Sequence, residues 1–202
     1  MYLGIKRILD VFAVLISAPV WLPVMLVLAL AVKLSSPGPV FFKQKRYGRN
    51  RKFFEIYKFR SMYPNAPKDV PTHLLQNPEA LITPVGRFLR KSSLDELPQV
   101  INILKGELSV VGPRPALWNQ HDLMAEREKY GANSVPVGIT GLAQVSGRDE
   151  LSIEKKAAYD GEYARRMGFF FDMYILMRTV ICVFSRDGVS EGGPGNGASI
   201  KK

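Results

Sequence analysis

Cysteine and histidine are scarce in this sequence. Cys182 is the single cysteine, and His73 and His121 are the two histidines, far apart along the chain. One cysteine excludes an internal disulfide framework, which fits a reducing compartment. The histidines have no cysteine or carboxylate at the spacing of a zinc site, which argues against zinc and against a Ser-His-Asp hydrolase.

Acidic residues are also few. The chain has 18 Asp and Glu against 28 Lys and Arg, a formal net charge of +10. This excess indicates an anionic partner: nucleic acid, an acidic membrane surface or a phosphorylated substrate. A merely solvated basic surface explains it equally well. The 202 residues are enough for one compact core rather than two full domains.

Charge is nearly absent from Ile8 to Val32, where Asp10 is the only charged residue. As a helix this run would extend about 37 Å, which is enough to cross a bilayer core. Pro19 and Pro23 remove amide donors from consecutive turns, and the hydroxyl of Ser17 can satisfy one of the released carbonyls. The run has no small-residue cleavage site, so it does not resemble a cleaved signal peptide.

Both flanks of this run are basic, whereas a spanning helix usually has a charge bias between its two sides. The flanking cations are Lys6 and Arg7 before it, and Lys33, Lys43, Lys45 and Arg46 after it. We therefore predict that residues 1–34 form a re-entrant membrane helix, which breaks near Pro19 and returns to the cytosolic face. A plain spanning helix with a proline kink is the alternative.

Two strands are predicted at Val40–Phe42 and Phe53–Phe59, joined through Gly48–Arg51. Aromatic residues interleaved with cations can bind single-stranded nucleic acid, but after a membrane helix the pattern favours anionic lipid headgroups. Only Glu55 opposes the cations of this region, which are Lys43, Lys45, Arg46, Arg49, Arg51, Lys52, Lys58 and Arg60.

The remaining pattern predicts an α+β fold, mainly helical with a small β-hairpin. Residues 35–187 would form a cytosolic catalytic domain with interfacial helices, and residues 188–202 a disordered Gly- and Ser-rich tail. An apolar helix such as 169–184 could also mediate pairing into an oligomer. We expect helices at 84–91, 94–104, 117–130, 152–167 and 169–184, a strand at 109–111, and at 138–141 a tight glycine turn able to offer amides to a phosphate.

Two adjacent carboxylates, Asp95 and Glu96, follow the cations Arg90 and Lys91. Ser93 and Glu96 fit a capping box, which places Asp95 in the first turn of a helix, and Pro98 either limits that helix or shifts its true start a few residues later. Consecutive helical residues point about 100° apart, which argues against a shared-proton pair and favours separate tasks. A capped helix start with surface cations is the alternative interpretation.

A carboxylate that attacks a phosphate ester meets like charge, so cations must lie close to it. Arg90 and Lys91 are candidates, as is Arg114, which Pro113 and Pro115 hold in a rigid turn. A magnesium ion is expected as well.

Three motifs carry a resemblance that extends from about Lys6 to Gly188. They are Ser93-Leu94-Asp95-Glu96-Leu97-Pro98-Gln99, then Leu104-Lys105-Gly106-Glu107-Leu108-Ser109-Val110-Val111-Gly112-Pro113-Arg114-Pro115, and Gly138-Ile139-Thr140-Gly141 with Gln144-Val145-Ser146-Gly147-Arg148. The chain resembles the bacterial sugar transferases, and more narrowly the small monotopic phosphoglycosyl transferases.

The resemblance implies that a sugar-1-phosphate moves from a UDP-sugar to a polyprenyl (undecaprenyl) phosphate with release of UMP. It assigns Asp95 as nucleophile and Mg²⁺ ligand, with Glu96 placing or deprotonating the lipid phosphate. It implies a bacterial cytoplasmic membrane enzyme of glycoconjugate or exopolysaccharide synthesis. Candidate substrate-binding residues are Arg90, Arg114, Arg148, Lys58 and Arg60, and the membrane break is assigned to Ser17 and Pro19.

The sequence departs from the family pattern at two places. The usual Ser-Pro break is here Ser17-Ala18-Pro19, and the segment before the Ile-Thr-Gly motif is Pro136-Val137-Gly138, with Leu142 where a Trp is usual. A non-catalytic basic membrane adaptor is the competing functional hypothesis, and we do not expect nucleic acid as a partner.

Overall fold

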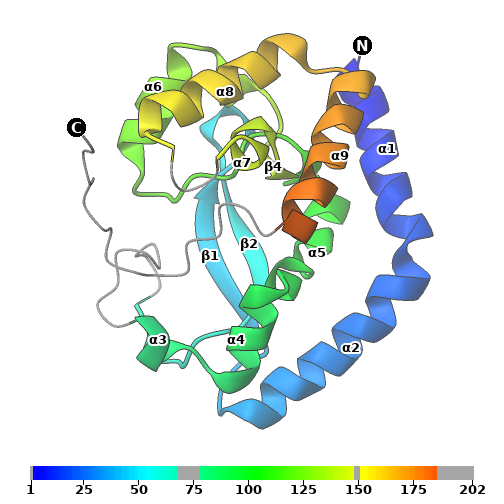
Figure 1. Ribbon diagram of the computed structural model, residues 1–202, viewed down its shortest axis with the longest axis vertical. Helices are drawn as coiled ribbons and strands as arrows, with labels where there is room; N and C mark the ends of the chain where they lie inside the picture. Colours follow the sequence, from blue (N-terminus) through cyan, green and yellow to red (C-terminus); the bar gives the residue numbers. More distant parts are fainter. Residues whose placement is uncertain (1, 68–77, 148–150, 186–202) are drawn as a thin grey trace.

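The computed structural model describes residues 2–67, 78–147 and 151–185. Helices predominate beside two small sheets, which confirms the predicted α+β class. In the view of Figure 1 a long hairpin runs down the centre, with helices to its sides and across one end. The sheets pair β1 Phe41–Tyr47 with β2 Phe53–Phe59, and β3 Ser109–Val111 with β4 Gly138–Thr140. The helices are α1 Tyr2–Ile16, α2 Ala18–Ser35, α3 Pro78–Leu81, α4 Pro84–Lys91, α5 Gln99–Lys105, α6 His121–Glu128, α7 Leu142–Val145, α8 Ile153–Arg166 and α9 Phe169–Ser185.

The apolar N-terminal segment forms two helices, α1 and α2, which meet at an angle on the right of Figure 1. Ser17 separates them, and its hydroxyl donates to the carbonyls of Ala13 (2.7 Å) and Val14 (3.2 Å). The indole of Trp21 donates to the same Val14 carbonyl at 2.8 Å. Pro19 lies in the first turn of α2, where a missing amide is tolerated. Side chains therefore satisfy carbonyls of the last turn of α1 where the chain changes direction.

Buried charges attach α1 to the rest of the molecule. Asp10 is 7% exposed and accepts hydrogen bonds from the Ser109 hydroxyl (2.7 Å) and the Val110 amide (3.2 Å). Lys6 is 3% exposed and donates to Asp172 of α9 at 2.6 Å. A buried charge is costly unless it is paired, so these contacts fix which face of α1 turns inward.

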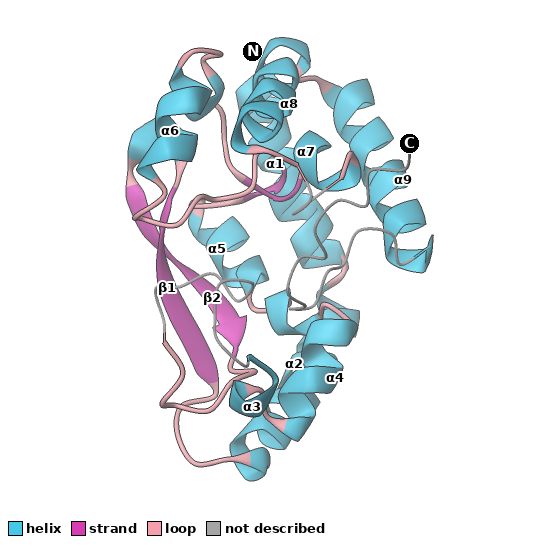
Figure 2. Ribbon diagram, turned by 60° about the vertical axis from the view of Figure 1, so that its left-hand side comes forward, coloured by secondary structure: helices cyan, strands magenta, loops and turns pink. Residues whose placement is uncertain are grey.

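The predicted hairpin is confirmed, although its first strand is longer than expected and extends to Tyr47. The strands pair antiparallel, with Lys45 opposite Glu55, and a turn at Arg49–Arg51 joins them. Figure 2 shows the hairpin at the edge of the helical body rather than enclosed by it. One strand face therefore remains open to solvent while the other packs on helices.

Asn102 of α5 joins this helix to β2. Its fully buried side chain accepts a hydrogen bond from the Tyr57 amide (3.0 Å) and donates to the Glu55 carbonyl (2.7 Å). Its amide nitrogen also donates to the carboxylate of Glu107 at 2.7 Å. The side chain thus pairs with the backbone of β2 as a neighbouring strand would. This contact fixes Lys58, the next residue of β2, relative to α5.

The glycine-rich stretch at residues 138–141 was predicted to be a tight turn, and this prediction is wrong. It forms β4, which pairs in parallel with β3. A Cβ on Gly138 would overlap the backbone nitrogen of Gly112, so glycine permits close approach of two chain segments. The amide of Gly138 donates to the Pro113 carbonyl at 2.9 Å and is therefore already engaged within the protein.

Most of the other predicted helices are confirmed. The predictions over 84–91, 152–167 and 169–184 correspond to α4, α8 and α9, and the hydroxyl of Ser152 caps α8. The helix predicted over 117–130 is shorter and is confined to α6. The tail predicted at 188–202 lies outside the described residues.

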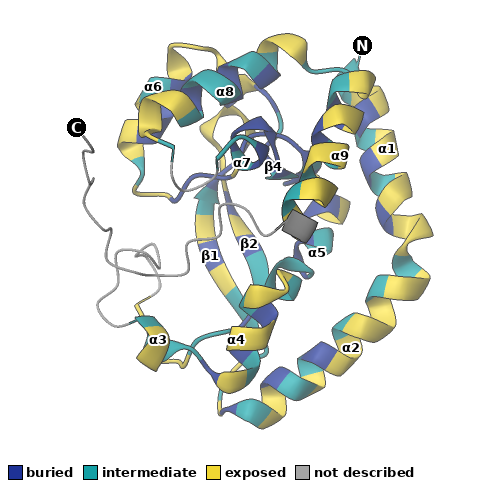
Figure 3. Cartoon of the chain, in the orientation of Figure 1, coloured by how far each residue is buried: buried dark blue, intermediate teal, exposed yellow. Residues whose placement is uncertain are grey.

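Apolar side chains are exposed on three helices. Ile8 of α1, Leu26 of α2 and Phe170 of α9 are 69%, 66% and 86% exposed. Exposed residues follow the outer sides of α1 and α2 and the front of α9 (Figure 3). In the described part of the chain, α2 is the helix whose length and composition would suit a membrane span. Soluble proteins rarely expose so much apolar surface, so these helix faces mark an interaction surface.

The contact between Asn102 and β2 predicts a large effect of a small change. Asn102→Asp replaces the donating amide with a carboxylate beside the Glu55 carbonyl and the Glu107 carboxylate. We expect a loss of about 3 kcal/mol and a fall of roughly 6–12 °C in the midpoint of thermal unfolding. Asn50→Asp, at an exposed position with a left-handed backbone that Asp tolerates, is the control. Equal midpoints for the two variants would contradict the assigned role of Asn102.

Candidate active site

Asp95 and Glu96 lie in one turn of 3₁₀ helix between α4 and α5. Ser93 precedes this turn with a left-handed φ of 57°, and its side chain caps nothing. A capping box needs an extended backbone at that position, so the predicted capping box is wrong. The helix predicted over 94–104 begins at Gln99, directly after Pro98, which is the later start that this proline allowed. The two carboxylates therefore occupy a tight connection instead of the first turn of a long helix.

Lys58 of β2 contacts both carboxylates. Its ammonium nitrogen lies 2.6 Å from Glu96 Oε1, which it hydrogen-bonds, and 3.9 Å from Asp95 Oδ2. Arg114 Nη2 lies 3.2 Å from the same Glu96 oxygen. Glu96 is thus held by two cations, whereas Asp95 is only loosely paired. The neighbouring carboxylates share a cation but differ in their hydrogen bonds.

Their surroundings shift the pKa values of the two carboxylates in opposite directions. Burial raises the pKa of Asp95, and so does the charge of Glu96, while Lys58, Arg90 and Arg114 only partly offset this effect. Burial would also raise the pKa of Glu96, but the charges and hydrogen bonds of Lys58 and Arg114 outweigh it. The pKa of Glu96 therefore lies below the usual range of a glutamate.

The turn that carries Arg114 is held at four consecutive backbone carbonyls. Its two prolines fix φ, and the hydrogen bonds add a second restraint, so the predicted rigidity of this turn has two physical sources. The donors are the Gly138 amide to Pro113 O (2.9 Å), Arg127 Nη2 to Arg114 O (2.9 Å), Arg46 Nη1 to Pro115 O (3.0 Å) and the Tyr47 amide to Ala116 O (2.9 Å). Arg127 is itself fixed by a buried ion pair with Asp160 at 2.6 Å.

Arg60 lies elsewhere than at the dyad. It is 5% exposed, and its guanidinium donates to the backbone at the end of α2. Its acceptors are the carbonyls of Val32 (3.2 Å), Ser36 (2.7 Å) and Pro37 (3.0 Å), together with the Ser36 hydroxyl (2.9 Å). In the structure this arginine anchors the C-terminal end of α2 to the hairpin.

The other predicted binding residues divide into two groups. Arg90, at the end of α4, is close enough for its charge to lower the pKa of Asp95. With Lys58 and Arg114 it places three of the predicted cations around the dyad. Arg148 lies outside the described residues.

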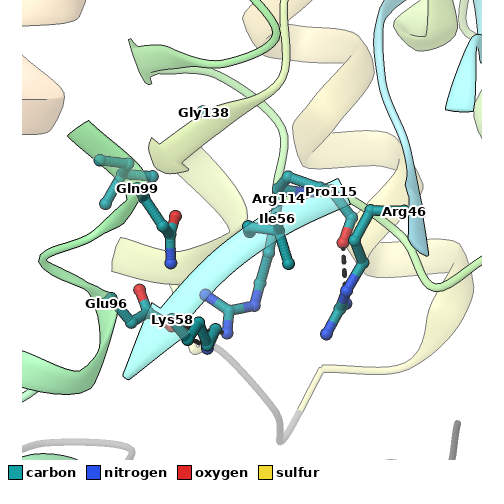
Figure 4. Close-up of a pocket in the computed structure, with 9 residues that line it drawn as sticks. Arg46, Ile56, Lys58, Glu96, Gln99, Arg114, Pro115 and Gly138 are labelled. Atoms are coloured by element: carbon teal, nitrogen blue, oxygen red, sulfur yellow. Dashed lines mark hydrogen bonds and ion pairs between the residues drawn. The ribbon is translucent and has the colours of Figure 1, made fainter. Parts of the chain in front are cut away.

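Arg46 is a neighbour of the site that we did not assign from the sequence. Glu96, Lys58, Arg114 and Arg46 line one small hollow, with Arg46 at the end away from Glu96 (Figure 4). Side chains of a strand alternate between its two faces. If the predicted first strand had been extended to Tyr47, this alternation would have placed Arg46 on the face that carries Lys58, away from Lys43 and Lys45. The predicted strand ended at Phe42, so this signal was missed.

The donor set at the dyad suits a hard cation with few protein ligands. Among the described residues there is no group of three or more His, Cys, Asp or Glu side chains that could hold a metal. The nearest cation to the Asp95 carboxylate in that part of the chain is Lys58, at 3.9 Å. One carboxylate with water and substrate oxygens is a usual arrangement for Mg²⁺, so these residues fit that ion.

Comparison with known proteins finds relatives along nearly the whole chain. A family model described as bacterial sugar transferase matches residues 1–186. "UDP-glucose:undecaprenyl-phosphate glucose-1-phosphate transferase" from Escherichia coli K12 is 43% identical over 183 residues, which cover 87% of this chain and 39% of that protein. "Uncharacterized sugar transferase EpsL" from Bacillus subtilis is 40% identical, covering 93% of this chain and 91% of that protein. "Undecaprenyl-phosphate galactose phosphotransferase" from Salmonella typhimurium is 35% identical, covering 91% and 41%. The chain therefore spans about two fifths of some relatives and nearly all of others.

The opposite pKa shifts predict opposite effects of two neutral substitutions on stability. At pH 7, Asp95→Asn should raise the unfolding midpoint, because the ionised Asp95 is disfavoured in the folded protein. Glu96→Gln should lower it, because the folded protein favours the ionised form of Glu96. Thermal unfolding of both variants across a pH series provides the measurement.

The two differences should also disappear in different pH ranges. The difference in unfolding midpoint between Asp95→Asn and the wild type should disappear as the pH falls through the raised pKa of Asp95. The difference in unfolding midpoint between Glu96→Gln and the wild type should begin to shrink only below pH 4.5, which is the ordinary pKa of glutamate. Shifts of the same sign at pH 7 would contradict this electrostatic description.

Proposed function

The chain belongs to the bacterial sugar transferase family, and on that basis we propose that it transfers a sugar-1-phosphate from a UDP-sugar to a polyprenyl phosphate at a membrane. The printed names of several relatives describe undecaprenyl-phosphate sugar phosphotransferases, which supports this reaction class. The observation that carries the proposal is the asymmetry of the dyad. Glu96 is held by two cations, while Asp95 is only loosely paired.

Asp95 would act as the nucleophile in two successive displacements. A carboxylate oxygen of Asp95 attacks the phosphorus that carries the sugar, the bond to the bridging oxygen breaks, and UMP leaves with the electron pair. An oxygen of the polyprenyl phosphate then attacks the same phosphorus. The bond to Asp95 breaks, which restores the carboxylate and releases the lipid-linked diphosphate sugar.

Glu96 would act by orienting cations rather than by accepting a proton. Its pKa is lowered, so it is a weak base at neutral pH. Its oxygen holds Lys58 at 2.6 Å and Arg114 at 3.2 Å, beside the carboxylate that must approach an anionic phosphate. Arg90 adds positive charge near Asp95. A Mg²⁺ ion held by Asp95 and substrate oxygens would further neutralise the phosphate charge.

The N-terminal segment would enter the membrane and return on the same side. The buried pair of Lys6 and Asp172 attaches the beginning of α1 to the body of the protein, and Arg60 attaches the end of α2 to the same body. A straight spanning helix would place these two ends on opposite sides of the bilayer. The break at Ser17 and the exposed apolar faces of α1 and α2 support a re-entrant arrangement at the cytosolic face.

The nucleophile is tested by Asp95→Asn, which keeps the shape of the side chain and removes its charge. We expect UMP release from UDP-sugars in the presence of polyprenyl phosphate and Mg²⁺ to fall by roughly a thousandfold or more. No phosphosugar should become attached to the variant protein. Asp122→Asn, an exposed carboxylate at the start of α6, should retain normal turnover. Near-normal turnover of Asp95→Asn would rule out the nucleophile assignment.

The topology is tested with single cysteines at exposed positions before α1 enters the membrane and after α2. Gly4→Cys and Pro39→Cys, each in a Cys182→Ser background, should react with an impermeant maleimide from the cytosolic side only. The measurement compares intact cells with inside-out vesicles. Labelling of the two positions from opposite sides would support a spanning helix instead.

A further inference from the structure

Arg46 is a cation of the candidate site that forms no ion pair with a carboxylate of the described residues. It lies on β1, beside the turn that carries Arg114, and an isolated backbone bridge joins it to Leu117. In the described part of the chain its hydrogen bonds go to neutral oxygens, namely Gln44 Oε1 and the Pro115 carbonyl. No carboxylate of the described residues lies within ion-pair distance of it. Such a cation is prepared to bind an anion.

The electrostatic surroundings of Arg46 lead to the same conclusion. Burial and the nearby charge of Arg114 lower the pKa of Arg46 to about 9, and Glu96 offsets this only in part. Its surroundings therefore disfavour the positive form of the Arg46 guanidinium, which is still the dominant form at neutral pH. An anion bound between Arg46 and Arg114 would relieve the repulsion between the two guanidinium groups.

The guanidinium of Arg46 has donors left for such an anion. Nε and Nη2 both donate to Gln44 Oε1, and Nη1 donates to the Pro115 carbonyl. A guanidinium has five N–H groups, so one remains on each terminal nitrogen. Two N–H groups on a planar fork match the oxygens of a phosphate.

The order of the side chains indicates which phosphate this is. Figure 4 shows Glu96 and Lys58 at one end of the hollow, Arg114 in the middle and Arg46 at the other end. In phosphoryl transfer the attacking and leaving oxygens are roughly in line. If Asp95 attacks from the dyad end, the nucleotide phosphate departs at the far end, where its charge increases.

Resting on the proposed function, we infer that Arg46, together with Arg114, binds the phosphate of the departing nucleoside monophosphate. Arg46 contributes in this way to donor affinity and to release of the leaving group. It takes no part in recognition of the lipid acceptor. Its hydrogen bond to Pro115 is a second, structural role that keeps Arg114 in place.

The inference is tested by titrating UMP into the detergent-solubilised full chain in a calorimeter. Arg46→Gln keeps a hydrogen-bond donor but removes the charge, and should weaken UMP binding roughly tenfold to a hundredfold. The KM for the UDP-sugar should rise while the KM for polyprenyl phosphate stays unchanged. Lys45→Gln is the matched control, because Lys45 is the adjacent residue and its ammonium lies over the exposed Phe53 ring. It should bind UMP as the wild type does.

A second variant tests the charge without removing the arginine. Gln44→Glu places a carboxylate where Arg46 now contacts a neutral oxygen, so Arg46 gains a permanent counterion inside the protein. UMP binding should weaken again, with the unfolding midpoint maintained. A merely structural Arg46 would instead give unchanged UMP affinity in Gln44→Glu, or equal rises in both KM values in Arg46→Gln.

The outcomes separate this inference from the proposed function. If the wild type releases UMP and Arg46→Gln binds UMP normally, the role of Arg46 is overturned and the proposed reaction stands. If the wild type neither binds UMP nor releases it from any UDP-sugar, both are overturned.

Discussion

The side chain of Asn102 is the contact on which the site depends most. Its two polar atoms pair with the backbone of β2 on either side of Ile56, at an edge of β2 that pairs with no strand of the described residues. Because Lys58 lies on β2 and Glu96 lies just before α5, the contact of Asn102 with β2 holds the two segments that carry this ion pair side by side. A buried side chain with both hydrogen-bonding functions satisfied is a rigid reference point, since any displacement leaves several polar groups unpaired. The position of the Lys58 charge beside Asp95 and Glu96 therefore depends on a residue that contacts neither carboxylate.

A second constraint determines where positive charge can lie. The turn at Arg114 cannot shift, because its carbonyls are occupied by donors from β1, α6 and β4. Two of those donors, Arg46 and Arg127, are themselves cations, so arginines serve both to build the turn and to set its potential. Glu96 completes the arrangement by pairing with both Lys58 and Arg114, and this leaves Asp95 the more loosely paired carboxylate. Adjacent residues of the same chemical type thus acquire opposite pKa shifts through their neighbours.

Local patterns in the sequence were sufficient for elements whose causes are local. The hairpin, α4 and α8 were predicted in this way, and the dyad was found because two carboxylates follow two cations. The glycine segment at 138–141 was misassigned because glycine is favoured both in a tight turn and where two chain segments pack closely, as here against Gly112. Ser93 was misassigned because a left-handed backbone at a serine has no local signal. The separate locations of Arg46 and Arg60, both cations of one hairpin, depend on contacts with distant segments and were not accessible to pattern reasoning.

The buried charges on α1 have a consequence for the order in which the protein is completed. Asp10 and Lys6 both lie on α1, but their partners lie 99 and 166 residues further along the chain. Until β3 and α9 have been made, the apolar helix carries two charges without their final partners. Contacts of such long sequence separation form late. During synthesis α9 therefore completes the attachment of α1, because Asp172 can pair with Lys6 only after all the segments between them have been made.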